Sequence, residues 1–148
     1  MNKVLIYLHA GNSHGMGHFQ RSKLVGEFLK KNGYEVTFTG ELSDYCVKQL
    51  ALNFKLREPY VTYGDAVIVD ALYVSQSFEQ YLAAASNVIA ISPMLNYNDC
   101  ITHICTRSPI MHTNSISNKE VYVDPYFAFW GCLIENREFF SEKQKLDI

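Results

Sequence analysis

The feature that most constrains the fold is an apolar run followed by a glycine-rich turn and an amphipathic segment. The run is Val4–Leu8, the turn carries Gly15 and Gly17, and the amphipathic segment covers residues 19–31. This order predicts a buried strand, a loop and a helix. Glycines let the backbone approach a ligand closely, and a helix start offers unpaired N–H groups with partial positive charge. The stretch is therefore typical of a site for an anion such as phosphate.

The predicted helix carries a cation on its apolar face. Leu24, Val25, Phe28 and Leu29 define that face, and Arg21 falls in its middle, in the first turns of the helix. A guanidinium there needs an anionic partner or an exit to solvent. Two partners fit, the carboxylate of Asp70 or a ligand phosphate; in the alternative, Arg21 curls over the helix start and is solvated.

His18 lies at the predicted helix start. A helix N-terminus disfavours the imidazolium and leaves a neutral ring that can accept a proton from water or a hydroxyl. We expect His18 to be a general base. The alternative is a loop histidine that hydrogen-bonds its own backbone.

Apolar strands and helices alternate along the chain, which predicts an α/β domain with a Rossmann-like, doubly wound and mostly parallel sheet. We expect one such domain over residues 1–148, because no repeat or linker interrupts the pattern. The predicted strands cover residues 3–9, 34–39, 54–56, 60–63, 66–70, 87–91, 101–105 and 121–123, and the predicted helices residues 19–31, 44–52 and 75–86.

Ligands of such sheets bind at the carboxyl ends of the strands. His18, Asp70 and Ser92 each follow a predicted strand, so we expect them on one rim. Asp70 has four candidate roles: it orients His18, pairs with Arg21, binds a ligand hydroxyl or caps the next helix. The predicted site therefore has His18 and Asp70 as catalytic residues, with ligand contacts from Gly15, Gly17, Arg21, Ser13 and Ser92.

Composition excludes several classes of function. The formal net charge is −2, without a basic run, which disfavours nucleic-acid binding. The sequence has neither a transmembrane segment nor a secretory signal, so we expect a cytoplasmic protein whose four cysteines are free thiols. We expect no cofactor and no metal site, because Gly15 and Gly17 separate His14 from His18 and no glutamate lies near them in the chain.

The stretch Gly15-Met-Gly-His-Phe-Gln-Arg21 resembles the G-x-G-H-x-x-R opening of GT-B-type glycosyltransferases. The resemblance is specific over residues 3–39, loose to about residue 92 and very thin afterwards; Asp70 resembles an aspartate that closes a strand in the family. Within the superfamily, the chain is most similar to the UDP-sugar hydrolase of pseudaminic acid biosynthesis and related predicted glycosyltransferases. This implies the N-terminal half of a GT-B fold, with the loop histidine acting on a bound sugar. The acidic pair that the family carries after the next strand is replaced here by Ser92-Pro-Met94.

We therefore expect a chain that processes a UDP-sugar, by hydrolysis or by transfer to an acceptor, with His18 as base. The family's second Rossmann-like domain would come from a second half in trans or from a homo-oligomer. The alternative is a non-catalytic module that binds a sugar nucleotide or docks a partner through the aromatic stretch Tyr126–Trp130.

Overall fold

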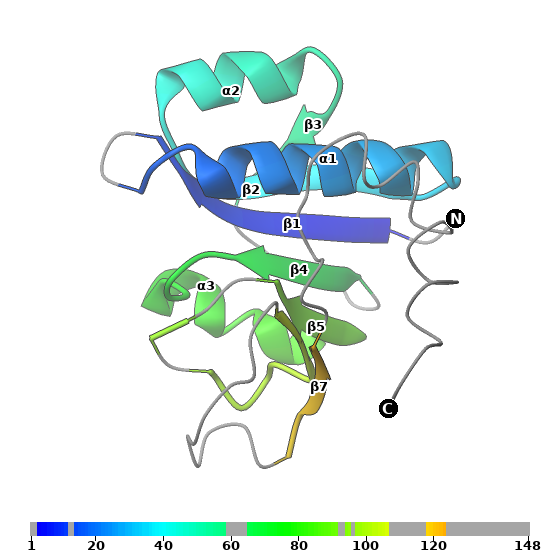
Figure 1. Ribbon diagram of the computed structural model, residues 1–148, viewed down its shortest axis with the longest axis vertical. Helices are drawn as coiled ribbons and strands as arrows, with labels where there is room; N and C mark the ends of the chain where they lie inside the picture. The colour runs from blue at the N-terminus through cyan, green and yellow to red at the C-terminus, as the bar shows by residue number, and fades with distance from the viewer. Residues whose placement is uncertain are drawn as a thin grey trace, which may run out of the picture.

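A computed structural model describes residues 3–11, 14–58, 65–91, 94–95, 97–106 and 118–123. Its centre is a parallel sheet of seven strands (Figure 1). The strands are β1 (Lys3–Ala10), β2 (Glu35–Leu42), β3 (Lys55–Leu56), β4 (Ala66–Asp70), β5 (Asn87–Ala90), β6 (His103–Thr106) and β7 (Glu120–Val123). The strand expected at residues 60–63 and the stretch Tyr126–Trp130 lie outside the described residues.

The strand order is β3-β2-β1-β4-β5-β6-β7, and every neighbouring pair is parallel. The chain builds outward from β1 through β2 to β3, and then returns to place β4 on the other side of β1. The order thus reverses between β1 and β4, which is where Rossmann-like sheets open a crevice at the carboxyl ends of the strands. The predicted α/β, Rossmann-like class with a parallel sheet is confirmed.

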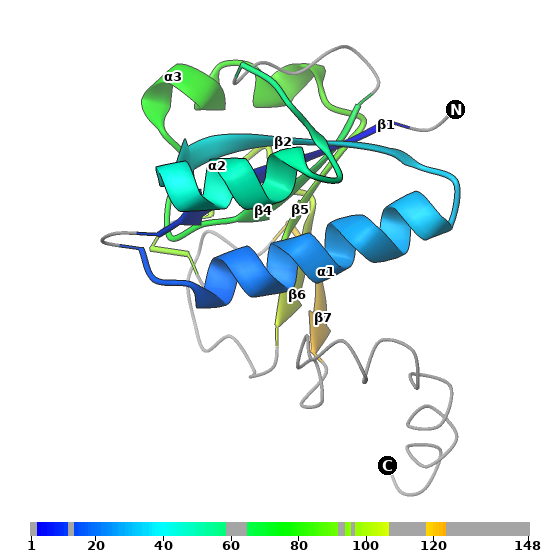
Figure 2. The ribbon, with the colours of Figure 1, turned by 90° about the horizontal axis from the view of Figure 1, so that it is seen from above.

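Helices cover both faces of the sheet (Figure 2). One face carries α1 (Gly17–Lys31) and α2 (Asp44–Ala51), and the other carries α3 (Gln76–Glu79) and the 3₁₀ turn η1 (Leu82–Ala84). The helix α2 begins where the sequence predicts, because the Ser43 side chain accepts a hydrogen bond from the Cys46 N–H and caps it.

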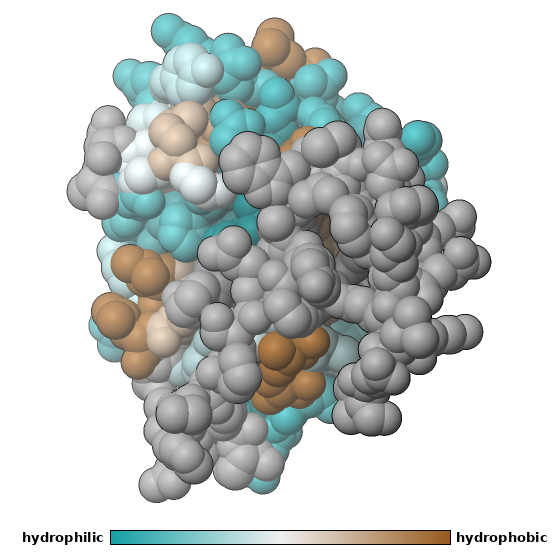
Figure 3. Space-filling view, in the orientation of Figure 1, coloured by the Kyte–Doolittle hydropathy of each residue, from teal (hydrophilic) through white to brown (hydrophobic). Residues whose placement is uncertain are grey.

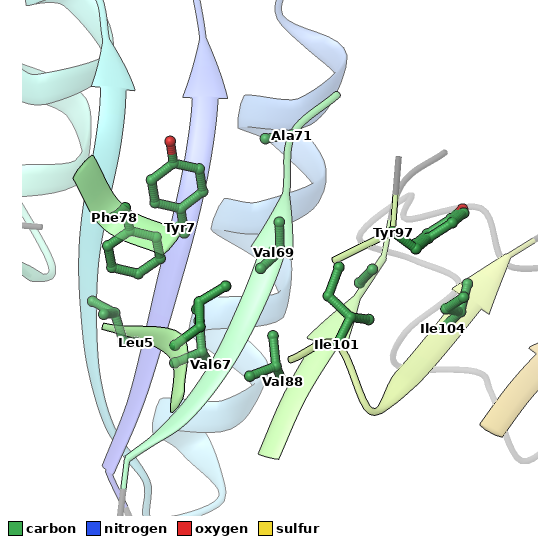
Figure 4. Packing of buried hydrophobic residues seen from close by; sticks show 12 residues of the cluster. Leu5, Tyr7, Val67, Val69, Ala71, Phe78, Val88, Tyr97, Ile101 and Ile104 are labelled. Atoms are coloured by element: carbon green, nitrogen blue, oxygen red, sulfur yellow. The ribbon is translucent and has the colours of Figure 1, made fainter. Parts of the chain in front are cut away.

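Alternation along β1 divides the core into two layers. Leu5 and Tyr7 point toward α3, and Tyr7 stacks on Phe78 with ring centroids 4.4 Å apart (Figure 4). Val4, Ile6 and Leu8 alternate with them and point toward α1 and α2, where they join Phe19 and Phe38 in a second buried cluster. Since side chains of a strand alternate between faces, this pattern also fixes where the polar residues at the strand ends point.

The segment expected as one helix over residues 75–86 is broken. The helix α3 has four residues, and the chain continues through i→i+3 hydrogen bonds, from Tyr81 N–H to the Phe78 carbonyl and from Ala85 N–H to the Leu82 carbonyl. Phe78 and Leu82 are nevertheless both buried, as their spacing predicts. Apolar spacing therefore identified the buried side chains but not the tighter backbone.

The buried face of α1 also differs from the expected one. Phe19, Ser22 and Gly26 are its buried residues, whereas Phe28 is 46% exposed. At Gly26 the helix comes so close to the sheet that a Cβ would lie 2.8 Å from Cζ of Phe38. Ser22 and Gly26, together with Phe19, thus form the contact face, and Val25 and Leu29 flank it.

The longest described helix, α1, has 15 residues, and none in the described part combines the length and apolarity that a membrane span requires. Figure 3 shows several separate apolar groups among the described residues of this face. Cys46 and Cys100 are free thiols, and Cys132 lies outside the described residues.

Candidate functional site

A glycine-bearing loop connects β1 to α1. Gly11 and Gly15 have φ values of 86° and 73°, a region that side chains with a Cβ rarely occupy. The Gly11 N–H donates to the Gly15 carbonyl at 3.1 Å, and the His14 N–H donates to the Gly11 carbonyl at 2.9 Å. These bonds turn the chain back on itself, so that α1 starts directly beside the end of β1.

The start of α1 has the properties of an anion site. Its N-cap residue, Met16, provides no side-chain hydrogen bond, and the first turn holds no acidic residue. A Cβ at Gly15 or Gly17 would have no atom within 4 Å, so the backbone borders open space there. The helix dipole and the N–H groups of the first turn are therefore available to a negatively charged ligand.

Asp70 ends β4 on the face covered by α1. Its neighbour Ile68 packs in the α1 layer, so alternation turns the Asp70 side chain toward the same helix. The carboxylate is fully buried (0% exposed) and lies next to Leu8 of β1 in the sheet register. It thus lies under α1 at the carboxyl ends of β1 and β4, where a buried charge requires hydrogen-bond partners.

Three side chains of α1 satisfy this carboxylate. Oδ1 lies 2.6 Å from Nδ1 of His18 and accepts a hydrogen bond from Nη2 of Arg21. Oδ2 accepts from Nε of Arg21 at 2.9 Å and from Oγ of Ser22 at 2.8 Å. Four donors fill the acceptor positions of the two oxygens. Asp70 is therefore occupied by its own chain and has no lone pair left for a ligand hydroxyl.

Burial, the largest single influence, raises the pKa of Asp70. The hydrogen bonds from His18 and Arg21 and the charge of Arg21 act in the opposite direction and outweigh it, so the pKa of Asp70 is lowered overall. Asp70 is thus ionised and can only accept hydrogen bonds. Nδ1 of His18 must then carry the proton, even though Nη2 of Arg21 also lies 3.1 Å from it.

This assignment defines what His18 can do. With the proton on Nδ1, the neutral ring has its lone pair on Nε2, and no described residue hydrogen-bonds that atom. The His18 side chain is 19% exposed, although Nδ1 faces a fully buried carboxylate. Nε2 can therefore accept a proton from a bound molecule, and Asp70 would stabilise the imidazolium that results.

The structure settles where several of the predicted residues lie. His18, Arg21 and Asp70 meet in one cluster, Gly15 and Gly17 border it, and Ser75 rather than Asp70 is the N-cap of α3. Arg21 contacts Asp70 through two nitrogens, so that carboxylate is the anionic partner its position requires. The predicted contacts Ser13 and Ser92 lie outside the described residues.

Sequence reasoning missed Ser22. It follows Arg21 and lies four positions after His18, a spacing that puts His18 and Ser22 on the same face of a helix. Its position inside the contact face was therefore a usable signal, because a buried serine requires a hydrogen-bond partner. That partner is Asp70.

Comparison of the chain with protein-family models, with curated proteins and with solved structures finds no match.

Proposed function

We propose that the chain processes a nucleotide-activated sugar in the crevice between β1 and β4, with His18 as general base. The observation that carries the proposal is the hydrogen bond of 2.6 Å between Nδ1 of His18 and Oδ1 of Asp70. It fixes the ring and its tautomer, and leaves Nε2 as the proton acceptor. The resemblance of the Gly15–Arg21 stretch to GT-B-type enzymes supplies the substrate class.

The chemistry is a displacement at the anomeric carbon. Nε2 of His18 takes the proton of a water molecule or of an acceptor hydroxyl as its oxygen bonds to that carbon. The bond from the carbon to the nucleotide phosphate breaks, and the diphosphate leaves with the electron pair. Asp70 stays ionised and stabilises the imidazolium, and Arg21 balances the charge of Asp70 inside the protein.

The start of α1 supports the diphosphate as the leaving group. An uncapped first turn without acidic residues attracts negative charge, and the backbone at Gly15 and Gly17 borders open space. We assign phosphate contacts to this backbone, and we assign Arg21 to holding Asp70.

The same resemblance implies that this Rossmann-like unit is the N-terminal half of a GT-B arrangement. A second half would provide the opposite wall of the crevice and most of the nucleotide contacts. It would come from another chain or from a second copy of this one.

The proposal is tested by incubating the full chain with a panel of UDP-hexoses and measuring the release of UDP. In His18→Ala we expect turnover to fall by about 10²–10⁴-fold, the usual contribution of a positioned acid or base. His103→Ala is the matched control, because His103 is a partly exposed histidine paired with Glu120 on β7, away from the site. Equal turnover in wild type and His18→Ala would contradict the role of His18.

Binding is measured in parallel by NMR titration with UDP. Shifts confined to residues 14–21, together with turnover that depends on His18, support the proposal. Shifts there without turnover favour the alternative, a non-catalytic module that binds a sugar nucleotide. If the titration gives no shifts and the assay gives no turnover, both the enzyme and the non-catalytic binding module are rejected.

A further inference from the structure

A second group of polar side chains lies at the same end of the sheet, but on the face opposite to Asp70. It contains His9 near the end of β1, Glu41 near the end of β2 and His14 from the loop between β1 and α1. His9 and Glu41 are direct neighbours in the β1–β2 register. His9 alternates with Leu8, so it shares the face of Tyr7 rather than the face that α1 covers.

The three side chains converge. Each places one potential ligand atom, a ring nitrogen or a carboxylate oxygen, within 4.8 Å of the other two. Nε2 of His14 lies 3.2 Å from Oε2 of Glu41, and Nε2 of His9 lies 3.8 Å from Oε1. With metal–ligand bonds of about 2.0–2.2 Å, tetrahedral ligand atoms are about 3.3–3.6 Å apart. The two nitrogen–oxygen distances lie within a few tenths of an ångström of this range, and the two histidines would have to come closer together where their ligand atoms lie up to 4.8 Å apart.

His9 is the residue that an ordinary ion pair does not explain. Its ring is buried (1% exposed), and Nδ1 has no hydrogen-bond partner among the described residues. Nε2, the nitrogen that lies 3.8 Å from Glu41, is also 2.8 Å from the Tyr7 hydroxyl, so a metal bound at Nε2 would replace that hydrogen bond. A buried polar atom without a partner is costly.

The surroundings resemble the outer shell of a metal site. The Tyr73 hydroxyl donates to Oε2 of Glu41 at 3.3 Å, and its ring lies edge-on against His9, with centroids 4.7 Å apart. Partners of this kind orient metal ligands and fix the tautomers of histidines.

We propose that His9, His14 and Glu41 bind a divalent transition metal, with Zn²⁺ as the best fit. Two imidazoles and one carboxylate are a known zinc ligand set, whereas Mg²⁺ and Ca²⁺ prefer oxygen ligands throughout. Three protein ligands leave a fourth position for water or a ligand. The metal would tie the loop that carries Gly15 to the ends of β1 and β2. Sequence distance concealed this set, because Glu41 lies 27 positions from His14.

The test is a calorimetric titration of the full, tag-free chain with Zn²⁺. We expect one Zn²⁺ per chain and a rise in melting temperature that a chelator reverses. His14→Ala and Glu41→Gln should each weaken binding by at least about tenfold, since loss of an outer partner alone costs about 10–100-fold. Both side chains are partly exposed, at 21% and 47%, and circular dichroism checks that the variants fold.

His103→Ala is the matched control. Nε2 of His103 lies 3.3 Å from a carboxylate oxygen of Glu120. This pair resembles the pair of His14 and Glu41, but no third potential ligand among the described residues lies beside it. Zinc binding should be unchanged in this variant. It should also be unchanged in His18→Ala, which separates this proposal from the role of His18 in turnover.

Three outcomes would overturn the proposal. One is the absence of stoichiometric Zn²⁺ binding, and another is wild-type affinity in folded His14→Ala and Glu41→Gln. The third is a Co²⁺ spectrum with thiolate charge-transfer bands, which would assign the metal to cysteines.

Discussion

Nδ1 of His18 and Oδ1 of Asp70 lie 2.6 Å apart, which joins the first turn of α1 to the end of β4 across 52 positions of the sequence. The contact lies at the carboxyl ends of β1 and β4, where the strand order reverses. Because Asp70 is ionised and buried, it holds both the orientation of the His18 ring and the position of its proton. Stability and the proposed chemistry consequently depend on the same carboxylate.

Replacing the Asp70 carboxylate should destabilise the folded chain. In Asp70→Asn, Arg21 loses its anionic partner, and the new amide group faces donors. We expect the free energy of unfolding to fall by about 3 kcal/mol, the lower end of the range for breaking a buried ion pair, because Arg21 is partly exposed. Urea denaturation measures the loss.

Glu120→Gln is the control for that measurement. Glu120 is exposed and pairs with His103, so removing its charge should change the unfolding free energy by less than about 1 kcal/mol. Equal losses in the two variants would show that burial does not strengthen the Asp70 cluster.

Acid should weaken the fold through Asp70. Its pKa is lowered in the folded chain, so its contribution to stability is complete above the ordinary carboxyl pKa of 3.8. That contribution is lost as the pH falls from there through the lower pKa of the folded state. The difference in unfolding free energy between wild type and Asp70→Asn should therefore shrink in that window. A difference that stays constant on acidification would contradict the lowered pKa.

The close approach of α1 to the sheet predicts opposite results at two glycines of one helix. In Gly26→Ala the added Cβ would meet the buried Phe38 ring at 2.8 Å, and overpacking of about 1–3 kcal/mol should exceed the helix-propensity gain of about 1 kcal/mol. In Gly17→Ala the Cβ enters open space, so stability should not fall. Thermal unfolding of both variants checks this, and a destabilised Gly17→Ala beside an unaffected Gly26→Ala would contradict it.

Much of the fold was predictable because local signals and tertiary structure agree at β1, the glycine loop and α1. The meeting of His18 with Asp70 was also predictable in outline, since each follows an apolar strand and parallel strands end at one edge of a sheet. The choice among the four candidate roles of Asp70, and the hydrogen bond from Ser22, were not predictable. They depend on β4 lying next to β1, which no local pattern encodes.

Other features depend on packing at particular points. The strand β2 was expected to stop at Thr39, but it runs to Leu42. Gly40 interrupts the apolar pattern of this strand. A Cβ at this position would lie 2.0 Å from the Leu8 carbonyl oxygen, so a glycine is needed where β2 comes close to β1, and it does not mark a turn. The same extension carries Glu41 to His9 and His14, and for that reason the sequence alone concealed the candidate metal ligands.

The central claim is that Asp70 holds the proton of neutral His18 on Nδ1 and leaves Nε2 as the base. Long-range ¹H–¹⁵N NMR of the full chain, at a pH where the ring is neutral, reads the protonation of each nitrogen; His18→Gln assigns the signals. We predict a protonated Nδ1 and an unprotonated Nε2, with this preference weakened in Asp70→Asn. A proton on Nε2 in the wild-type chain, or a tautomer that Asp70→Asn does not alter, would contradict the account.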